Sequence, residues 1–466
     1  MTYSLRPPTL EHSTTRYVRA GVTKDSRSKW LWIFGLPPLL ALAGCGEEKL
    51  REFLGYYTPR ERYEHALRES GLDQTALGRD WFAAAAAALD DPVTIEPPYR
   101  EESYLDHREA VALAYRVPLR RGERIEVAFE SQADSSYQVF IELFILRSGS
   151  NASPRHITTA DSLERTLDHL ARRDGDYLIR IQPELLRGGR YSISIVVLPS
   201  LVFPVQGGDR GDIGSWYGDP RDGGRRQHEG LDIFARRWTP VLAAADGVVR
   251  STRSNGLGGN VVWLRDKYDR SHYYAHLQEQ AVRRGDRVQA GDTIGFVGNS
   301  GNARTTPPHL HFGMYSRGSF DPWPSLQERD TVPAEFSGDR DLVGEIVRVN
   351  REGARFRELP SSRSTLLAEL PLHTPLRVEA GAGDWYRVTT PDGTLGFVST
   401  SLTEPADSPV RSAVVNGDGV LLTEPAATAV AVDHIAPGAE VPVLGAFGEF
   451  LFVQSPSGRM GWLAPN

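Results

Sequence analysis

PPHLHFGMY, residues 307–315, places His309 and His311 one residue apart in an apolar run. This alternation is typical of a β-strand, in which successive side chains point to opposite faces. Both histidines would then face one way, and Leu310 and Phe312 the other. Two imidazoles on one face would line the same cavity. The alternative is a half-exposed strand in which the two histidines occur by chance.

A second polar pair stands upstream in HEGLD, residues 228–232, where His228 and Asp232 are four positions apart. This spacing puts both side chains on one face of a helix or of a strand, and the glycine between them disfavours a helix. In a strand, Glu229 points away from whatever His228 and Asp232 hold. Glu229 is therefore a poor candidate for a general base.

Imidazole and carboxylate groups are good ligands for Zn²⁺, and catalytic zinc usually takes three protein ligands and keeps one position for water. His228, Asp232 and one of the two histidines at 309 and 311 make three, and the alternation does not choose between the two. The segment SHYYAHL, residues 271–277, adds His276 on a further predicted strand. Histidines without a metal can move protons at neutral pH. The set predicts a metal-dependent hydrolase.

Four segments, HEGLD, YYAHL, GDTIGFVGNSG and PPHLHF, follow one another between residues 228 and 312. Each alone is a weak signal, but together they resemble the LytM/lysostaphin-type zinc endopeptidases, a peptidoglycan hydrolase family, over roughly residues 210–325. The resemblance implies a small, mostly antiparallel β domain with an open groove. It also implies a set of site residues: His228, Asp232 and His311 as zinc ligands, with His276 and His309 as the unligated catalytic pair.

The sequence departs from the family pattern at two places near these motifs. Trp238 stands in ARRWTPV where the family usually has glycine before Thr-Pro, and Pro307 replaces the glycine of the usual Gly-Pro before His309. Both changes would reshape the rim of the groove without removing a ligand. His272 lies four residues before His276, so we expect it on the same strand face, as a rim residue. The two tyrosines between these histidines are expected to pack.

Length and composition describe a folded, multidomain chain. With 466 residues, about three domains are expected. Hydrophobic residues make up 40% and charged residues 24%, which is usual for folded, water-soluble proteins. The net charge of −7 gives no basic surface, which argues against nucleic-acid binding.

The single cysteine, Cys45, follows LLALAG after a short apolar stretch with basic residues before it. This arrangement is typical of a secretory signal and is too short and interrupted for a spanning helix. Residues 42–45 resemble the lipobox of bacterial lipoproteins, which implies cleavage before Cys45, lipidation of its sulfur and a membrane anchor. Gly46 in the next position favours, by analogy, an outer membrane lipoprotein facing the periplasm.

The rest of the chain is predicted to form mostly β-strands. Alternating apolar residues indicate a β-sandwich, and two weakly similar C-terminal halves resemble bacterial SH3-like barrels, whose aromatic residues belong more often to the core than to a groove. The predicted organisation is 1–44 lipoprotein signal, 45–98 helical spacer, 99–200 β-sandwich, 201–332 zinc metallopeptidase domain, 340–405 SH3-like domain and 410–466 second SH3-like domain. The aromatic residues in question are Trp385, Tyr386, Phe397, Phe450, Phe452 and Trp462.

These observations favour a zinc-dependent endopeptidase that binds the peptide stems of bacterial peptidoglycan, hydrolyses their cross-links and is held beside the wall by its membrane anchor. The alternative is a non-catalytic wall-binding regulator or amidase activator built on the same domain, against which the full set of site residues argues. A cysteine hydrolase is excluded because the only thiol lies in the signal. The chain contains no His-Glu-x-x-His motif, so a thermolysin-like site is not expected.

Overall fold

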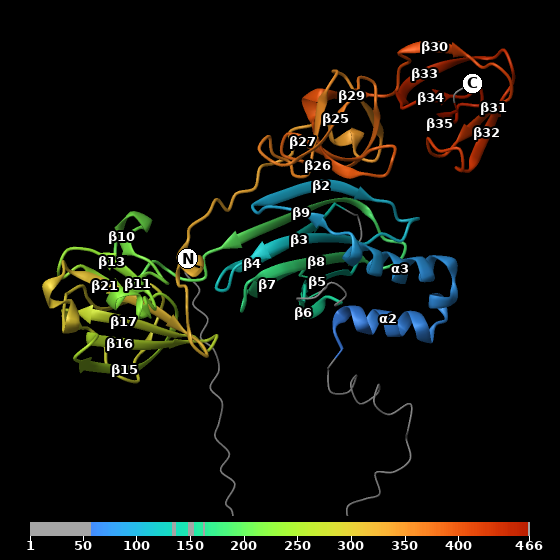
Figure 1. Cartoon of the computed structure of the whole chain (residues 1–466). Coiled ribbons are helices and arrows are strands. Elements are labelled where there is room, and N and C mark those ends of the chain that lie inside the picture. The colour runs from blue at the N-terminus through green and yellow to red at the C-terminus, as the bar shows by residue number, and fades with distance from the viewer. Residues whose placement is uncertain (1–56, 133–136, 148–152, 162–163, 465–466) are drawn as a thin grey trace, which may run out of the picture. The chain divides into compact units, whose positions relative to one another are not determined.

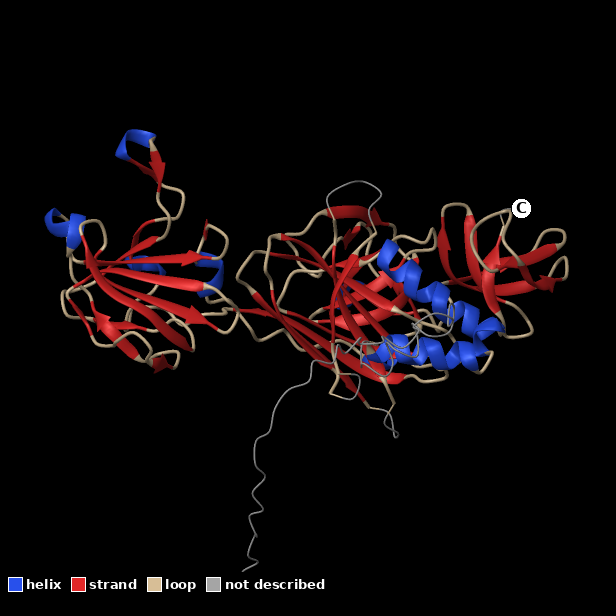
Figure 2. Cartoon of the chain, turned by 90° about the horizontal axis from the view of Figure 1, so that it is seen from below, coloured by secondary structure: helices blue, strands red, loops and turns tan. Residues whose placement is uncertain are grey.

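The structure is a computed structural model that describes residues 57–132, 137–147, 153–161 and 164–464. Cys45 and the predicted lipoprotein signal lie outside these residues. Strands dominate the described chain, as the colouring in Figure 2 shows, and this confirms the predicted mostly β, multidomain class. Within the described residues, no helix combines the length and apolar composition needed to cross a membrane.

Two helices, α2 (Pro59–Glu69) and α3 (Ala76–Asp90), form where helices were predicted. Thr58 and Glu61 cap the start of α2 reciprocally, which satisfies two otherwise free backbone N–H groups. The indole of Trp81 on α3 is buried and donates to the carbonyl of Pro183, which fixes the helix against the neighbouring sheet. The single-turn helices are η1 (Leu72–Gln74), η2 (Arg210–Asp212), η3 (Asp222–Gly224), η4 (Gly301–Thr305), η5 (Arg340–Leu342) and η6 (Thr400–Leu402).

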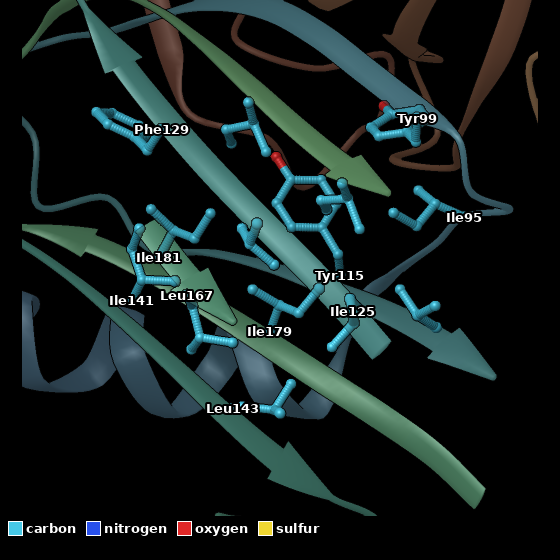
Figure 3. Packing of buried hydrophobic residues seen from close by; sticks show 14 of the residues in the cluster. Ile95, Tyr99, Tyr115, Ile125, Phe129, Ile141, Leu143, Leu167, Ile179 and Ile181 are labelled. Carbon is cyan, nitrogen blue, oxygen red and sulfur yellow. The ribbon is translucent and has the colours of Figure 1, made fainter. Parts of the chain in front are cut away.

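The next strands form two sheets around one apolar core. Figure 3 shows buried side chains such as Tyr115, Ile125 and Ile179 filling the space between the strands. The first sheet has the order β1 (Val93–Thr94), β3 (Leu113–Leu119), β8 (Gly175–Pro183), β5 (Val139–Ile145) and β6 (Arg155–Thr159). The second contains β2 (Tyr99–Leu105), β9 (Gly189–Leu198), β4 (Arg124–Ser131) and β7 (Thr166–Leu170) in that order, and it continues past β2 into β26 (Pro375–Ala382). These two layers form the sandwich expected from the alternation.

A third, mostly antiparallel sheet carries the predicted site motifs (Figure 1). Its order is β10 (Ile213–Ser215), β13 (Leu231–Phe234), β21 (His309–Tyr315), β17 (Ser271–Leu277), β16 (Gly259–Asp266), β15 (Gly247–Asn255) and β19 (Arg287–Val288), with β22 (Ser319–Phe320) beside β21. Smaller elements are β14 (Pro240–Leu242), β20 (Thr293–Phe296), β18 (Glu279–Gln280), the pair β11 (Pro220–Arg221) and β12 (Arg226–Gln227), and helix α4 (Trp323–Leu326).

The two C-terminal halves have the same strand pairing. In each half, the second strand pairs with the third and the sixth, and the fifth pairs with the fourth and the sixth. The first half contains β23 (Ile346–Val349), β24 (Ala354–Arg357), β25 (Leu366–Leu370), β26 (Pro375–Ala382), β27 (Trp385–Thr389), β28 (Leu395–Ser399) and β29 (Thr403–Pro405). The second contains β30 (Arg411–Val414), β31 (Gly419–Leu422), β32 (Ala431–Ile435), β33 (Glu440–Phe447), β34 (Phe450–Gln454) and β35 (Met460–Leu463).

The aromatic residues of these halves are mainly core residues, as expected. Four of them are buried, namely Tyr386, Phe397, Phe452 and Trp462. Trp385 and Phe450 are half-buried. A charged pair is also buried here: Arg387 of β27 donates to Glu101 of β2, where β2 pairs with β26.

Candidate metal centre and active site

The histidine strand lies where the alternation predicts it. β21 pairs with β13 so that Asp232 is opposite His311 and Phe234 is opposite His309. Leu310 and Phe312 are fully buried on the core side, while both histidines line a cavity of about 870 Å³ on the other side. The predicted strand, its facing and its shared cavity are all confirmed.

Three predicted side chains meet in this cavity with their donor atoms in a small triangle. His228 Nε2 lies 3.0 Å from Asp232 Oδ1 and 3.0 Å from His311 Nδ1, and the third side, His311 Nδ1 to Asp232 Oδ1, is 2.9 Å. They are the one group of this kind among the described residues whose ligand atoms lie close enough to hold a metal ion together. The structure thus brings together the residues implied as ligands and places His311, not His309, in the group.

The protonation of His228 shows why this triangle suits a cation. Its Nδ1 lies 2.8 Å from the carbonyl oxygen of Trp216, which can only accept, so Nδ1 carries the hydrogen in the neutral ring. The lone pair of Nε2 then faces a carboxylate oxygen and a second imidazole nitrogen. A shared hydrogen cannot satisfy three acceptors at once, whereas a divalent cation accepts all three. The donor set therefore fits zinc.

Asp232 is held by groups on both of its oxygens. Arg221 donates from Nη2 to Asp232 Oδ2 at 2.7 Å and to Ser215 Oγ at 2.7 Å. Burial disfavours the charged carboxylate, but the hydrogen bonds of His228 and His311 outweigh burial and lower the pKa of Asp232 well below its ordinary value. The side chain is therefore an ionised acceptor at neutral pH. Sequence reasoning missed Arg221 and Ser215, because neither belongs to a recognisable motif.

Gly230 is required by the close approach of β21. A Cβ atom there would lie 2.5 Å from the carbonyl oxygen of Phe312 and 2.9 Å from the His311 ring. Only glycine leaves room for the imidazole directly above the chain that links His228 to Asp232. The glycine of HEGLD thus shapes the metal centre through space rather than through a side chain.

His276 reaches the cavity because the chain breaks its alternation just before it. Tyr273 and Ala275 line the cavity, while Tyr274 is fully buried in the core, so regular alternation would turn His276 inward. The pairing of β17 with β16 shifts register between Asn260 and Val262, and His276 itself has φ +62°. This bulge with a left-handed residue re-aims the side chain toward the cavity.

His276 and His309 form an imidazole pair beside the triangle, with ring centroids 5.0 Å apart. His276 Nδ1 lies 2.9 Å from the carbonyl oxygen of Ser300, and His309 Nδ1 lies 2.9 Å from that of Pro307. Both neutral rings therefore carry hydrogen on Nδ1 and leave Nε2 as an acceptor. Burial, followed by the neighbouring His309, lowers the pKa of His276 to about 4, so this ring is neutral at physiological pH.

The expectation that His272 is a rim residue is wrong. His272 is fully buried on the core side of β17, where its Nε2 lies 3.1 Å from Asp266 Oδ2. Arg270 donates from Nε to the same carboxylate oxygen at 2.6 Å. Burial lowers the pKa of His272, although Asp266 opposes that shift. The cluster is structural, and the bulge before His276 is the reason the two histidines do not share a face.

Two further expectations were partly wrong. Glu229 lines the rim of the same cavity, where Tyr315 donates to its Oε2 at 3.3 Å, because residues 228–230 precede β13 and do not follow its alternation. Its carboxylate is not among the three clustered donors. Tyr274 packs in the core as expected, whereas Tyr273 stacks on Trp263, with centroids 4.5 Å apart, and faces the cavity.

Comparisons with known proteins agree with this geometry. Residues 226–322 match Peptidase family M23, and residues 352–404 match the bacterial SH3 domain. The chain is 43% identical over 126 residues to the L-Ala--D-Glu endopeptidase of Bacillus subtilis, covering 24% of this chain and 39% of that protein. It is 40% identical over 99 residues to the peptidoglycan DD-endopeptidase ShyC of Vibrio cholerae, covering 21% of this chain and 22% of that protein.

Among solved structures, the catalytic domain of lysostaphin from Staphylococcus simulans is similar at 34% identity and a TM-score of 0.22, covering 24% of this chain and 88% of that one. The chain spans less than two fifths of the length of either curated relative above. It therefore contains an M23 peptidase domain, whose relatives are named endopeptidases, and a bacterial SH3 domain.

Proposed function

We propose that this protein is a zinc-dependent endopeptidase that hydrolyses peptide cross-links of bacterial peptidoglycan. The observation that carries the proposal is the placement of two kinds of group in one cavity. The metal-binding atoms of three side chains lie within about 3 Å of one another, namely those of His228, Asp232 and His311. A pair of imidazoles, His276 and His309, lies beside this triangle and is not part of it. Three ligands with neighbouring free bases are what metal-assisted hydrolysis requires.

When bound, the zinc ion would acidify a water molecule and polarise the scissile carbonyl. Side chains of the protein carry out the proton transfers. His276 and His309 are each oriented by a backbone carbonyl, so their Nε2 atoms are the acceptors that take a proton from the attacking water. The ring that has taken this proton then returns it from Nε2 to the leaving amine. Arg221 holds Asp232 in place through its second oxygen.

The substrate class follows from the named relatives and from the shape of the site. The two relatives above carry names for different bonds, since one is named an L-Ala--D-Glu endopeptidase and the other a peptidoglycan DD-endopeptidase. The open cavity of about 870 Å³ has room for a stretch of peptide. We assign cleavage to the cross-link between stem peptides, of the diaminopimelate kind if the host has two membranes.

The remaining regions are assigned to placement at the wall. The lipobox at residues 42–45 would tether the chain through Cys45 to the outer membrane, facing the periplasm. The second C-terminal half repeats the strand pairing of the half that contains the SH3 match, which supports a tandem of SH3-like domains. A Cys45→Ala variant should lose lipid labelling and move from the membrane fraction to the soluble fraction. Unchanged membrane fractionation of that variant would contradict the tether.

The decisive experiment is digestion of purified sacculi by the purified protein, with and without a chelator, followed by mass identification of the products. Cross-linked muropeptides should disappear and monomers accumulate, and the chelator should stop both. A wall-binding regulator predicts a different result, namely bound protein, little metal and an unchanged muropeptide profile. His434→Ala, an exposed histidine far along the sequence, serves as a matched control for the histidine variants.

A further inference from the structure

The turn between β13 and β14 holds a tryptophan in a conformation that suits glycine. Thr239 N donates to the carbonyl oxygen of Arg236 at 3.1 Å, which closes a four-residue turn. Trp238 is the third residue of that turn and has φ +72°. Turns of this kind favour glycine at the third position because a Cβ atom there is crowded. The tryptophan at this position therefore strains the backbone.

Packing does not account for this residue. Its ring touches Phe296, with centroids 5.8 Å apart, yet 51% of Trp238 is exposed. It is the one exposed tryptophan in the described part of the chain. A strained and half-exposed aromatic ring, on a turn that is hydrogen-bonded to the segment beside His309, is the kind of feature that a ligand contact explains.

The turn is linked to His309 through residues 297 and 298. Trp238 N donates to the carbonyl oxygen of Val297 at 2.9 Å, and His309 N donates to that of the next residue, Gly298, at 3.0 Å. The adjacent Arg237 donates to Gln278 and to Asn299, so two amide side chains are hydrogen-bonded to the turn that carries the aromatic ring. An apolar face bordered by hydrogen-bonding groups matches a sugar ring, which has apolar C–H faces and polar edges.

We propose that Trp238 and Phe296 form a platform for a ring of the glycan strand, an N-acetylated amino sugar, beside the peptide groove. This inference rests on the proposed function, because each stem peptide is covalently attached to the glycan and brings a sugar close to the groove that holds the peptide. The ring of Trp238 stacks on the C–H face of the sugar, and the residues of the turn border its hydroxyl and acetamido groups. The platform therefore favours stem peptides that are attached to a glycan strand over free peptides.

Trp238→Gly is an informative variant because it removes the ring and relieves the backbone at once. Leu186→Gly is the matched control, since Leu186 is also apolar, 62% exposed and at φ +59°, but lies in the turn between β8 and β9 of the sandwich. Both variants should unfold at the same temperature as the wild type or above it. Trp238→Phe keeps an aromatic ring and serves as the second variant if the glycine variant does not fold.

The measurement is calorimetric titration of the full chain, with chelator present, using a β-1,4-linked tetramer of N-acetylglucosamine. Trp238→Gly should weaken binding about tenfold or more, Trp238→Phe less, and Leu186→Gly not at all. In cleavage assays, Trp238→Gly should raise KM for sacculi and leave kcat/KM for a glycan-free cross-linked peptide unchanged. Equal oligosaccharide binding by the wild type and Trp238→Gly, or no binding by the wild type, would overturn the platform.

The two proposals fail separately. If the wild type does not cleave the glycan-free peptide, the proposed activity is wrong, while the oligosaccharide titration still decides the platform. If Trp238→Gly loses activity on the free peptide as well as on sacculi, the ring contacts peptide and the assignment to sugar is wrong.

Discussion

His272 and His276 lie four residues apart on β17 and face opposite sides of the sheet. His272 is fully buried against Asp266, whereas His276 lines the cavity beside His309. The reversal comes from the bulge opposite Val261 and from the left-handed backbone of His276, at φ +62°. The domain therefore stores backbone strain at the position that turns a second imidazole toward the cavity.

The first prediction concerns this strain. His276→Gly relieves the backbone and removes the base, so its thermal stability should be equal to or above that of the wild type while turnover falls by about 10²-fold or more. His373→Gly, at φ +64° in the first C-terminal half, is the control and should leave turnover unchanged. Calorimetry and sacculus digestion measure both. Full activity of His276→Gly would remove His276 from the catalytic pair.

The second prediction separates the triangle from the free bases. His228→Ala and Asp232→Ala each remove one of three donors, so zinc content and cleavage should be lost together. His309→Ala should retain about one zinc per chain and lose most turnover, because its ring does not belong to the triangle. Elemental analysis of dialysed protein provides the readout. A His309→Ala protein that loses its metal, or that digests sacculi normally, contradicts the assigned role.

A third prediction tests the close approach at Gly230. Gly230→Ala should destabilise the domain by about 1–3 kcal/mol, since the new methyl group meets the Phe312 carbonyl and the His311 ring. Metal affinity should fall with it, because the His311 ring must move. Gly256→Ala is the control, as nothing lies within 4 Å of its Cβ position. Denaturant unfolding measures the stability of both variants, and zinc titration measures their metal affinity. Equal values for the two variants would contradict the role of the close contact at Gly230.

The fourth prediction is a pH dependence of stability. Burial lowers the pKa of His272 in the folded state, so the unfolded chain binds more protons below its ordinary pKa of 6.5. Stability from this group is complete above pH 6.5 and declines as the pH falls below it. Asp266 acts in the same direction at lower pH: burial opposes its charge, but His272 and Arg270 lower its pKa to about 2.

His272→Asn keeps a donor for Asp266 and does not titrate. Its free energy of unfolding should therefore decline less steeply than that of the wild type between pH 7 and pH 5, as measured by denaturant unfolding at several pH values. A decline as steep as in the wild type would mean that His272 is not responsible.

The fifth prediction concerns the buried pair Glu101 and Arg387. Glu101 also accepts from the hydroxyls of Tyr99 and Tyr115, so its charge is fully enclosed. Arg387→Met leaves that charge without its cation and should cost about 3–5 kcal/mol. Arg377→Met breaks an exposed ion pair and should change stability by less than about 1 kcal/mol. Similar losses in the two variants would contradict the role of burial.

The sequence by itself determined the strand character of residues 309–315 and the facing of their side chains. Period-two alternation leaves one solution when one face must be buried, and Leu310 and Phe312 are fully buried as that argument requires. The sequence also determined the chemistry of the site. The side chains of His228, Asp232 and His311 are zinc ligands by type, so they suit a metal once the fold brings them together. Alternation could not choose between His309 and His311; the resemblance chose His311, and the structure places His311 in the triangle.

Only the tertiary structure decided which residues depart from a regular pattern. The bulge before His276 depends on the pairing of β17 with β16, and the position of Glu229 depends on where β13 begins, so alternation predicted the wrong facing for His272 and for Glu229. Arg221 reaches Asp232 from β11, a segment with no motif. Local patterns follow from local sterics and burial, whereas bulges and contacts between distant segments follow from packing that no short stretch of sequence contains.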